Sequence, residues 1–157
     1  MNLLMIDNVL KNPREYVTEA LAGEFIDYFD GVKMFRGIQP RSNDEFEKEV
    51  RKLFPNHDVR YNFIRKSSYN QIEPNFIHRD DMMGDITVLL YLNEIKPAND
   101  GTTIYDDREV SACVILSRFN RMIAFDSDCL HSRNIYENFG EGDGSRLVQV
   151  IFLEEVS

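Results

Sequence analysis

The stretch Leu147-Val148-Gln149-Val150-Ile151-Phe152-Leu153 is short, apolar and rich in β-branched residues, which is typical of a buried strand. Five runs of the same kind precede it, at residues 58–64, 86–92, 102–105, 112–116 and 122–125. Turn-forming residues separate these runs, and no helical pattern lies between them. Many short strands in succession predict an antiparallel sandwich or barrel.

Two helical patterns lie before these strands. The first starts at Asn12 and Pro13, with Asn12 as the expected N-cap, and its buried face would carry Tyr16, Val17, Ala20 and Leu21. The second starts with the capping box Ser42-Asn43-Asp44-Glu45, carries Phe46, Val50, Leu53 and Phe54, and ends at Pro55. We therefore expect one mainly β, α+β domain over residues 1–157. Residues 1–57 would form a helical support and residues 58–157 the barrel.

Composition narrows the class of protein. The net charge of -9 argues against a nucleic-acid partner, and no apolar run is long enough for a membrane span. The start, residues 1–7, lacks a basic segment and predicts a first strand rather than a signal peptide. Two cysteines, Cys113 and Cys129, are expected to be reduced thiols in a cytoplasmic protein.

The candidate chemistry begins at His78-Arg79-Asp80. On an extended chain His78 and Asp80 point to the same side, so that they could share one metal. The pair alone is a weak signal, because 27 of the 157 residues are acidic. His131, which follows several predicted strands later, completes a set of two histidines and one carboxylate. Such a facial triad leaves coordination positions open and suits non-haem Fe(II), whereas a structural zinc site usually has four protein ligands.

Arg146 is the next candidate, at the start of the last predicted strand. It would share one face with Val148, Val150 and Phe152. A guanidinium on the inner face of a barrel needs an anionic partner, and its two parallel N–H groups match a carboxylate. The partner is either a dicarboxylate co-substrate or a structural carboxylate of the chain.

The residues from Tyr61 to Phe152 resemble the prolyl-hydroxylase family of Fe(II)/2-oxoglutarate-dependent dioxygenases. The resemblance rests on five segments in the same order, which are Phe76 to Asp80, Ile86 to Asn93, Asp100 to Tyr105, Phe119 to Phe125 with His131, and Gly144 to Val148. The spacing from His131 to Arg146 is longer than is usual for the family, because Glu137 to Ser145 forms a glycine-rich acidic loop.

The resemblance implies a double-stranded β-helix, or jelly-roll, braced by N-terminal helices. It implies Fe(II) on His78, Asp80 and His131, and 2-oxoglutarate on Arg146 and Tyr91, with O2 as oxidant and ascorbate as a supporting reductant. No catalytic side chain beyond the metal centre is implied. The expected reaction is hydroxylation of a prolyl residue in a peptide or protein, or of a free amino acid, with release of succinate and CO2.

The substrate side is open. Arg133 and Tyr69 are candidate substrate-binding residues because they flank the expected pocket, as do the loops 65–75 and 137–145. The alternatives to a prolyl hydroxylase are an oxygenase of another small metabolite and a non-catalytic barrel that senses iron or 2-oxoglutarate. The full set of His78, Asp80, His131 and Arg146 favours an enzyme over a binding protein.

Overall fold

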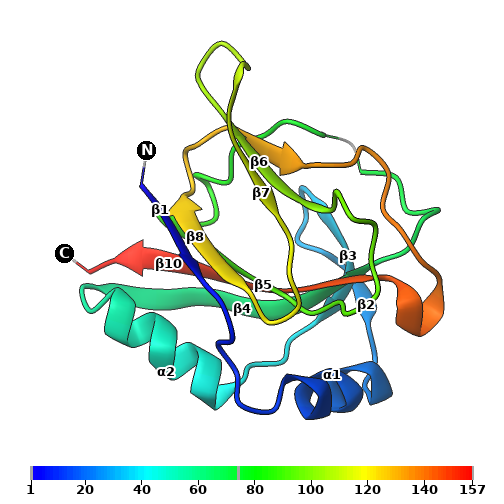
Figure 1. Ribbon diagram of the computed structural model, residues 1–157. Helices are drawn as coiled ribbons and strands as arrows, with labels where there is room; N and C mark the ends of the chain where they lie inside the picture. The colour runs from blue at the N-terminus through cyan, green and yellow to red at the C-terminus, as the bar shows by residue number, and fades with distance from the viewer. Residues whose placement is uncertain (1, 74, 157) are drawn as a thin grey trace.

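The structure is a computed structural model that describes residues 2–73 and 75–156. Its centre is two antiparallel sheets that face each other (Figure 1). The seven-stranded sheet has the spatial order β1 (Leu3–Ile6), β8 (Met122–Asp126), β5 (Ile86–Tyr91), β10 (Arg146–Glu155), β4 (His57–Ser67), β3 (Met34–Gln39) and β2 (Ile26–Phe29). The three-stranded sheet has the order β7 (Ser111–Leu116), β6 (Gly101–Tyr105) and β9 (His131–Arg133). The mainly β, α+β fold predicted from the sequence is confirmed.

The central strands of the large sheet, β5, β8 and β10, are buried on both faces, and this explains their continuous apolar runs. Strand β10 shows the alternation. Leu147 and Ile151 pack with the helices on one face, whereas Val148 and Phe152 belong to the core between the two sheets. The predicted inward face of this strand is therefore confirmed.

Two helices, α1 (Pro13–Ala22) and α2 (Asp44–Leu53), cover the outer face of the large sheet (Figure 1). Helix α1 buries Tyr16 and Ala20, as predicted. The hydroxyl of Tyr16 donates a hydrogen bond to the side chain of Gln149, which is fully buried on β10. Helix and sheet are thus joined by a polar contact as well as by apolar packing.

The helix caps differ in detail from the prediction. The N-cap of α2 is Asn43 and not Ser42, and its side chain accepts the backbone N–H of Phe46 at 2.9 Å. Asn12 does precede Pro13 at the start of α1, but its side chain makes no capping hydrogen bond.

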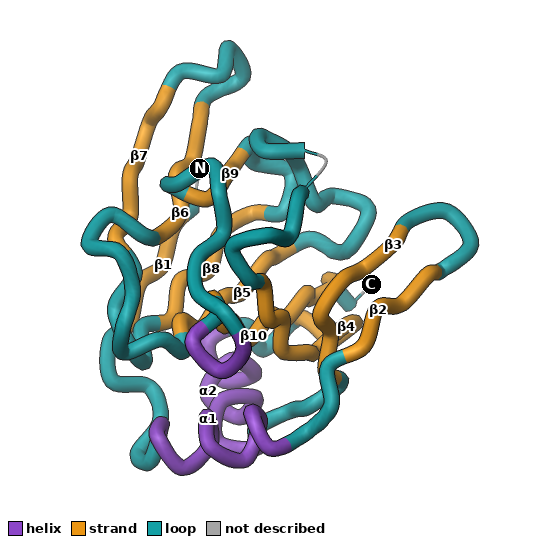
Figure 2. Tube along the Cα trace, turned by 90° about the vertical axis from the view of Figure 1, so that its right-hand side faces the viewer, coloured by secondary structure: helices purple, strands orange, loops and turns teal. Residues whose placement is uncertain are grey.

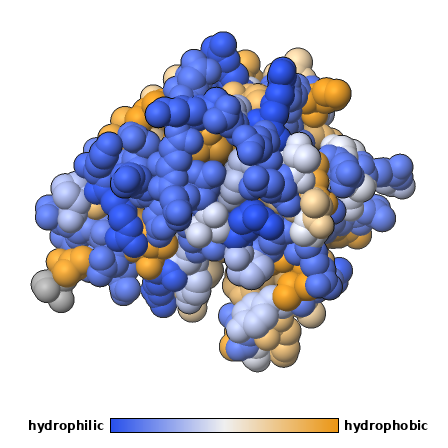
Figure 3. Space-filling view, turned by 90° about the horizontal axis from the view of Figure 1, so that it is seen from below, coloured by the Kyte–Doolittle hydropathy of each residue, from blue (hydrophilic) through white to orange (hydrophobic). Residues whose placement is uncertain are grey.

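The residues before 58 contribute strands as well as helices. Strand β1 confirms the predicted first strand and pairs with β8. Strands β2 and β3 were not predicted; they form a hairpin at the edge of the large sheet that projects from the body (Figure 2). The hairpin forms the lobe at the lower edge of Figure 3, where apolar colour gathers. The exposed apolar residues of the hairpin include Ile26, Tyr28, Phe29, Val32 and Met34.

None of the described helices has the length and apolar character needed to cross a membrane. Cys113 and Cys129 are both free thiols, as expected.

Candidate metal centre

The backbone brings the three predicted ligands together. His78 and Asp80 lie in the long segment between β4 and β5, and His131 is the first residue of β9. His78 forms an isolated antiparallel bridge with His131. The N–H of Asp80 bonds the carbonyl of Ser127 at 2.8 Å. The ligand positions are thus fixed by main-chain hydrogen bonds.

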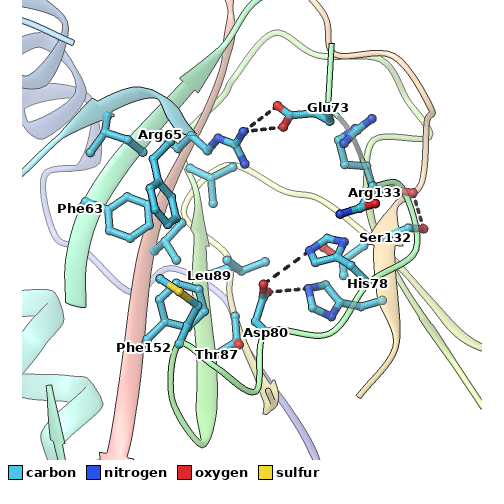
Figure 4. Close-up of a pocket in the computed structure, with 18 of the residues that line it drawn as sticks. Phe63, Arg65, Glu73, His78, Asp80, Thr87, Leu89, Ser132, Arg133 and Phe152 are labelled. Carbon is cyan, nitrogen blue, oxygen red and sulfur yellow. Dashed lines mark hydrogen bonds and ion pairs between the residues drawn. The ribbon is translucent and has the colours of Figure 1, made fainter. Parts of the chain in front are cut away.

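The side chains converge from these positions. One oxygen of Asp80 lies 2.9 Å from Nε2 of His131, and the other lies 3.7 Å from Nε2 of His78 (Figure 4). One ligand atom from each of the three residues lies within 4.8 Å of the others. His131 is buried, and the other two side chains are partly buried. The set has the spacing that a single ion requires.

The histidine rings have the orientation that a metal needs. Nδ1 of His78 lies 3.2 Å from the carbonyl of Phe76, and Nδ1 of His131 lies 3.0 Å from the carbonyl of Cys129. A carbonyl accepts but does not donate, so each Nδ1 carries the proton in these bonds. The lone pair of each Nε2 is then left to face Asp80, which is the ligand arrangement in which backbone carbonyls fix the tautomer. Two imidazoles and one carboxylate fit a 2-His-1-carboxylate iron site.

The charge state of Asp80 also fits a cation. Burial by itself would raise the pKa of the Asp80 carboxyl. Protonated imidazoles of His131 and His78 would more than offset this burial and hold that pKa well below its usual range, and a cation bound in place of their Nε2 protons would act in the same direction. The carboxylate is therefore ionised across the physiological range.

The triad opens into a cavity of about 240 Å³ between the sheets. Figure 4 shows Phe63 and Phe152 on one side of this cavity and His78 on the other, with Leu89 and Asp80 between them. Arg146, Val148, Val150 and Phe152 all line it from β10. The arginine predicted to point inward does so.

Arg146 already has a partner within the chain. Its Nε lies 3.4 Å from the carboxylate of Asp100, and Asp100 is buried and also accepts the hydroxyl of Ser117 at 2.7 Å. This is the structural carboxylate that the sequence left as an alternative. Since only Nε takes part in the contact with Asp100, the terminal amino groups of Arg146 remain for a ligand in the cavity.

Tyr91 lies one layer behind the cavity. Its hydroxyl is 2.6 Å from the hydroxyl of Thr102, and it is Thr102 that lines the cavity. Burial raises the pKa of Tyr91 to about 12, so the phenol keeps its proton. Among the described residues, Tyr91 is not part of the cavity wall. Thr102 lines the cavity in its place, and the sequence did not single out this residue.

The two predicted substrate residues have different positions. Arg133 lines the cavity, whereas Tyr69 is 54 % exposed and, among the described residues, does not belong to the cavity wall. The backbone N–H of Tyr69 bonds the carbonyl of Gly140 at 2.9 Å, and Asn138 donates to the carbonyl of Gln71 at 3.2 Å. The loops 65–75 and 137–145 therefore contact each other beside the cavity.

Two parts of the cavity were not anticipated. The first is the ion pair between Arg65 and Glu73, at 2.6 Å, which lies at the end of the cavity away from Asp80 (Figure 4). Burial raises the pKa of Glu73, but Arg65 more than offsets it, so the net pKa is lowered. The second is the β2–β3 hairpin, which adds Lys33, Met34, Phe35 and Ile38 to the wall.

Solved structures provide a comparison for this arrangement. The fold is similar to that of SnoN, a non-heme alpha-ketoglutarate-dependent epimerase from nogalamycin biosynthesis, with a TM-score of 0.68 and 14% identity over 98% of this chain and 77% of that one. It is also similar to EctD from S. alaskensis with bound Fe, with a TM-score of 0.61 and 10% identity over 98% and 72% of the two chains.

A third similar structure is HygX from Streptomyces hygroscopicus with nickel, 2-oxoglutarate and hygromycin B bound. Its TM-score is 0.59, and its identity is 12% over 98% of this chain and 82% of that one. No protein-family model and no curated protein sequence matches the chain. At these identities the likeness establishes the fold, which is the double-stranded β-helix expected from the sequence.

Proposed function

We propose that this protein is an Fe(II)- and 2-oxoglutarate-dependent dioxygenase. The observation that supports it most strongly is the convergence of His78, Asp80 and His131 with both Nε2 atoms turned toward the carboxylate. SnoN, EctD and HygX, which have a similar fold, are described with iron, with 2-oxoglutarate or as alpha-ketoglutarate-dependent, which agrees with this proposal.

Each residue has a defined part in the proposal. His78, Asp80 and His131 would hold Fe(II). Arg146, fixed through Nε by Asp100, would bind the distal carboxylate of 2-oxoglutarate with its terminal amino groups. Thr102 lies on the cavity wall, and its hydroxyl is hydrogen-bonded to the hydroxyl of Tyr91 behind it. The two hydroxyls would therefore form one polar region of the site. Phe63 and Phe152 would exclude water from the opposite side.

Bound iron, 2-oxoglutarate and O2 would supply the chemistry that converts a substrate C–H bond to C–OH, with succinate and CO2 as the other products. The resemblance to prolyl hydroxylases favours a prolyl residue or a free amino acid as substrate. The fold does not fix the outcome, since the similar protein SnoN is described as an epimerase.

The test is succinate release from 2-oxoglutarate by the purified protein with Fe(II), O2 and ascorbate, with proline peptides and free amino acids as candidate substrates. We expect iron-dependent succinate that is lost in Asp80→Ala. Asp81→Ala is the matched control, because Asp81 is the adjacent, exposed carboxylate and lies outside the triad. Binding of 2-oxoglutarate without any turnover would favour a sensor, and failure to bind both iron and 2-oxoglutarate would refute the proposal.

A further inference from the structure

The cavity has the opposite charge balance to the whole chain. The chain carries a net charge of -9. The cavity wall instead has five cationic side chains, Lys33, Arg65, Arg79, Arg133 and Arg146, and two acidic ones, Glu73 and Asp80. A cleft lined by one sign of charge concentrates the field and attracts ligands of the other sign. The cavity is therefore suited to anions.

Most of these cations already have carboxylate partners. Arg65 pairs with Glu73 at 2.6 Å, and Arg146 pairs with Asp100 at 3.4 Å. Arg79 is 43 % exposed and reaches Asp107 at 3.4 Å, on the outside of the molecule. These contacts leave Arg133 as the arginine whose charge is not compensated by a contact.

Arg133 is held in place without a carboxylate. Its guanidinium donates to the carbonyls of Ile135 and Tyr136 and lies 5.3 Å from the centre of the Phe76 ring. Among the residues that the structure describes, Arg133 forms no ion pair, and Glu73, whose negative charge acts on it, is already paired with Arg65. A partly buried guanidinium that is positioned in this way is prepared for an anionic ligand.

The position of Arg133 relates it to the proposed metal. His131 and Arg133 are two residues apart on β9, and both line the cavity. On a strand this separation is about 7 Å. An anionic group at Arg133 would leave the body of a small molecule between the guanidinium and the metal ligands, facing the apolar side that contains Phe63 and Phe152.

We infer that the primary substrate carries a carboxylate that Arg133 binds, and that it is a free amino acid rather than an internal residue of a polypeptide. The inference rests on the proposed function and specifies its substrate class. An internal prolyl residue has no carboxylate to offer. The cavity volume of about 240 Å³ also lies below the usual range of roughly 300–1,000 Å³ for ligand pockets, which favours a small molecule.

The test measures binding to the Zn(II)-loaded protein with 2-oxoglutarate, so that no turnover is needed. Each standard free amino acid is titrated by NMR beside its C-terminal amide, which lacks the negative charge. We expect at least one acid to bind about tenfold or more tightly than its amide, as a lost charge-assisted pair predicts. Equal binding of every acid and amide, or no binding of any acid, would overturn the inference.

Variants test whether Arg133 causes the preference for the free acid over its amide. Arg133→Gln should weaken binding of the acid to the level of the amide and leave binding of the amide and of 2-oxoglutarate unchanged. Arg133→Lys keeps the charge and should recover part of the preference, which guards against a loop disturbed by the lost carbonyl contacts. Arg108→Gln removes the same charge from an exposed turn between β6 and β7 and should change nothing. If Arg133→Gln instead abolishes 2-oxoglutarate binding, the inference is wrong, because Arg133 then belongs to the co-substrate.

Two further measurements distinguish a free amino acid from a chain end, and the Arg133 site from the proposed function. A dipeptide that ends in the preferred residue should bind more weakly than the free amino acid; equal or tighter binding would overturn the free amino acid and assign the carboxylate to a chain end. A wild-type protein that prefers acids over amides but binds no 2-oxoglutarate would refute the proposed function while leaving the Arg133 site in place.

Discussion

The backbones of His78 and His131 exchange two hydrogen bonds, each of 3.0 Å, although the two residues belong to different parts of the chain. In antiparallel pairing the side chains of two such residues lie on the same side. The imidazole ring centres are accordingly 4.4 Å apart. Because the main chain sets this separation, the metal ligands are positioned before any ion binds, which lowers the ordering cost of binding.

The first prediction concerns metal-linked stability. Adding Ni(II) at about 100 times its dissociation constant should stabilise the wild-type protein by roughly 2.7 kcal/mol. For a chain of this length that corresponds to a rise in Tm of about 5–10 °C. Asp80→Ala should abolish the rise, and Asp81→Ala should keep it. Thermal unfolding with and without the metal measures the rise within each variant, so that a lower starting Tm of Asp80→Ala does not matter. A full rise in Asp80→Ala would contradict the assigned ligand set.

The second prediction concerns Arg146. Arg146→Gln should weaken binding of 2-oxoglutarate about 10- to 100-fold, because charge-assisted hydrogen bonds to a carboxylate are lost. Binding of Ni(II) should stay the same, since Arg146 is not part of the triad. Calorimetry with each ligand separates the two effects.

Arg146→Gln also leaves the buried Asp100 without its cationic partner, and the protein should be less stable. The double variant Arg146→Gln with Asp100→Asn removes the unpaired charge. We expect the double variant to regain stability and to remain weak in 2-oxoglutarate binding. Recovery of 2-oxoglutarate binding in the double variant would mean that Arg146 acts only as a partner of Asp100.

The sequence was sufficient for the parts of the fold that local patterns determine. Strand β10 is apolar on both faces because helices cover one face and the second sheet covers the other, and that pattern is visible without a structure. The triad could be predicted because His78 and Asp80, two residues apart on an extended segment, point to the same side, and because the chain has only three histidines. That these residues meet His131 at one point depends on backbone pairing between distant segments, which no local pattern contains.

The β2–β3 hairpin was missed although a signal was present. Asp30-Gly31 is a turn-forming pair flanked by apolar residues, which is a known hairpin signal. The side chain of Asp30 accepts the N–H groups of Val32 and Lys33 at 2.8 and 2.7 Å. The strands were overlooked because β2 is exposed along its whole length and so shows no buried alternation.

The third prediction concerns the pH dependence of the Arg65–Glu73 pair. The folded pKa of Glu73 lies below its ordinary value of 4.5, so the pair's contribution is complete above pH 4.5 and is lost as the pH falls through the lower folded pKa. Glu73→Gln should therefore lower the free energy of unfolding by about 1–2 kcal/mol at pH 7. The difference from wild type should shrink below pH 4.5. Urea unfolding of the variant and the wild type at pH 7 and at a pH below 4.5 tests this, with Glu141→Gln, at an exposed position, as the control. A difference that does not change with pH would argue against the pair.

The last prediction concerns how the hairpin is attached, and it uses two glycines. Gly31 and Gly37 both have a positive φ, of 99° and 65°, so that alanine at either position is strained by about 1–2 kcal/mol. A Cβ at Gly37 would in addition lie 2.1 Å from the carbonyl oxygen of Lys66 on β4, whereas a Cβ at Gly31 meets nothing within 4 Å. Only Gly37→Ala should separate β3 from β4. Hydrogen exchange of the β3 amides should therefore be much faster in Gly37→Ala than in Gly31→Ala. Equal exchange in the two variants would show that backbone strain alone, and not the close approach to Lys66, limits this position.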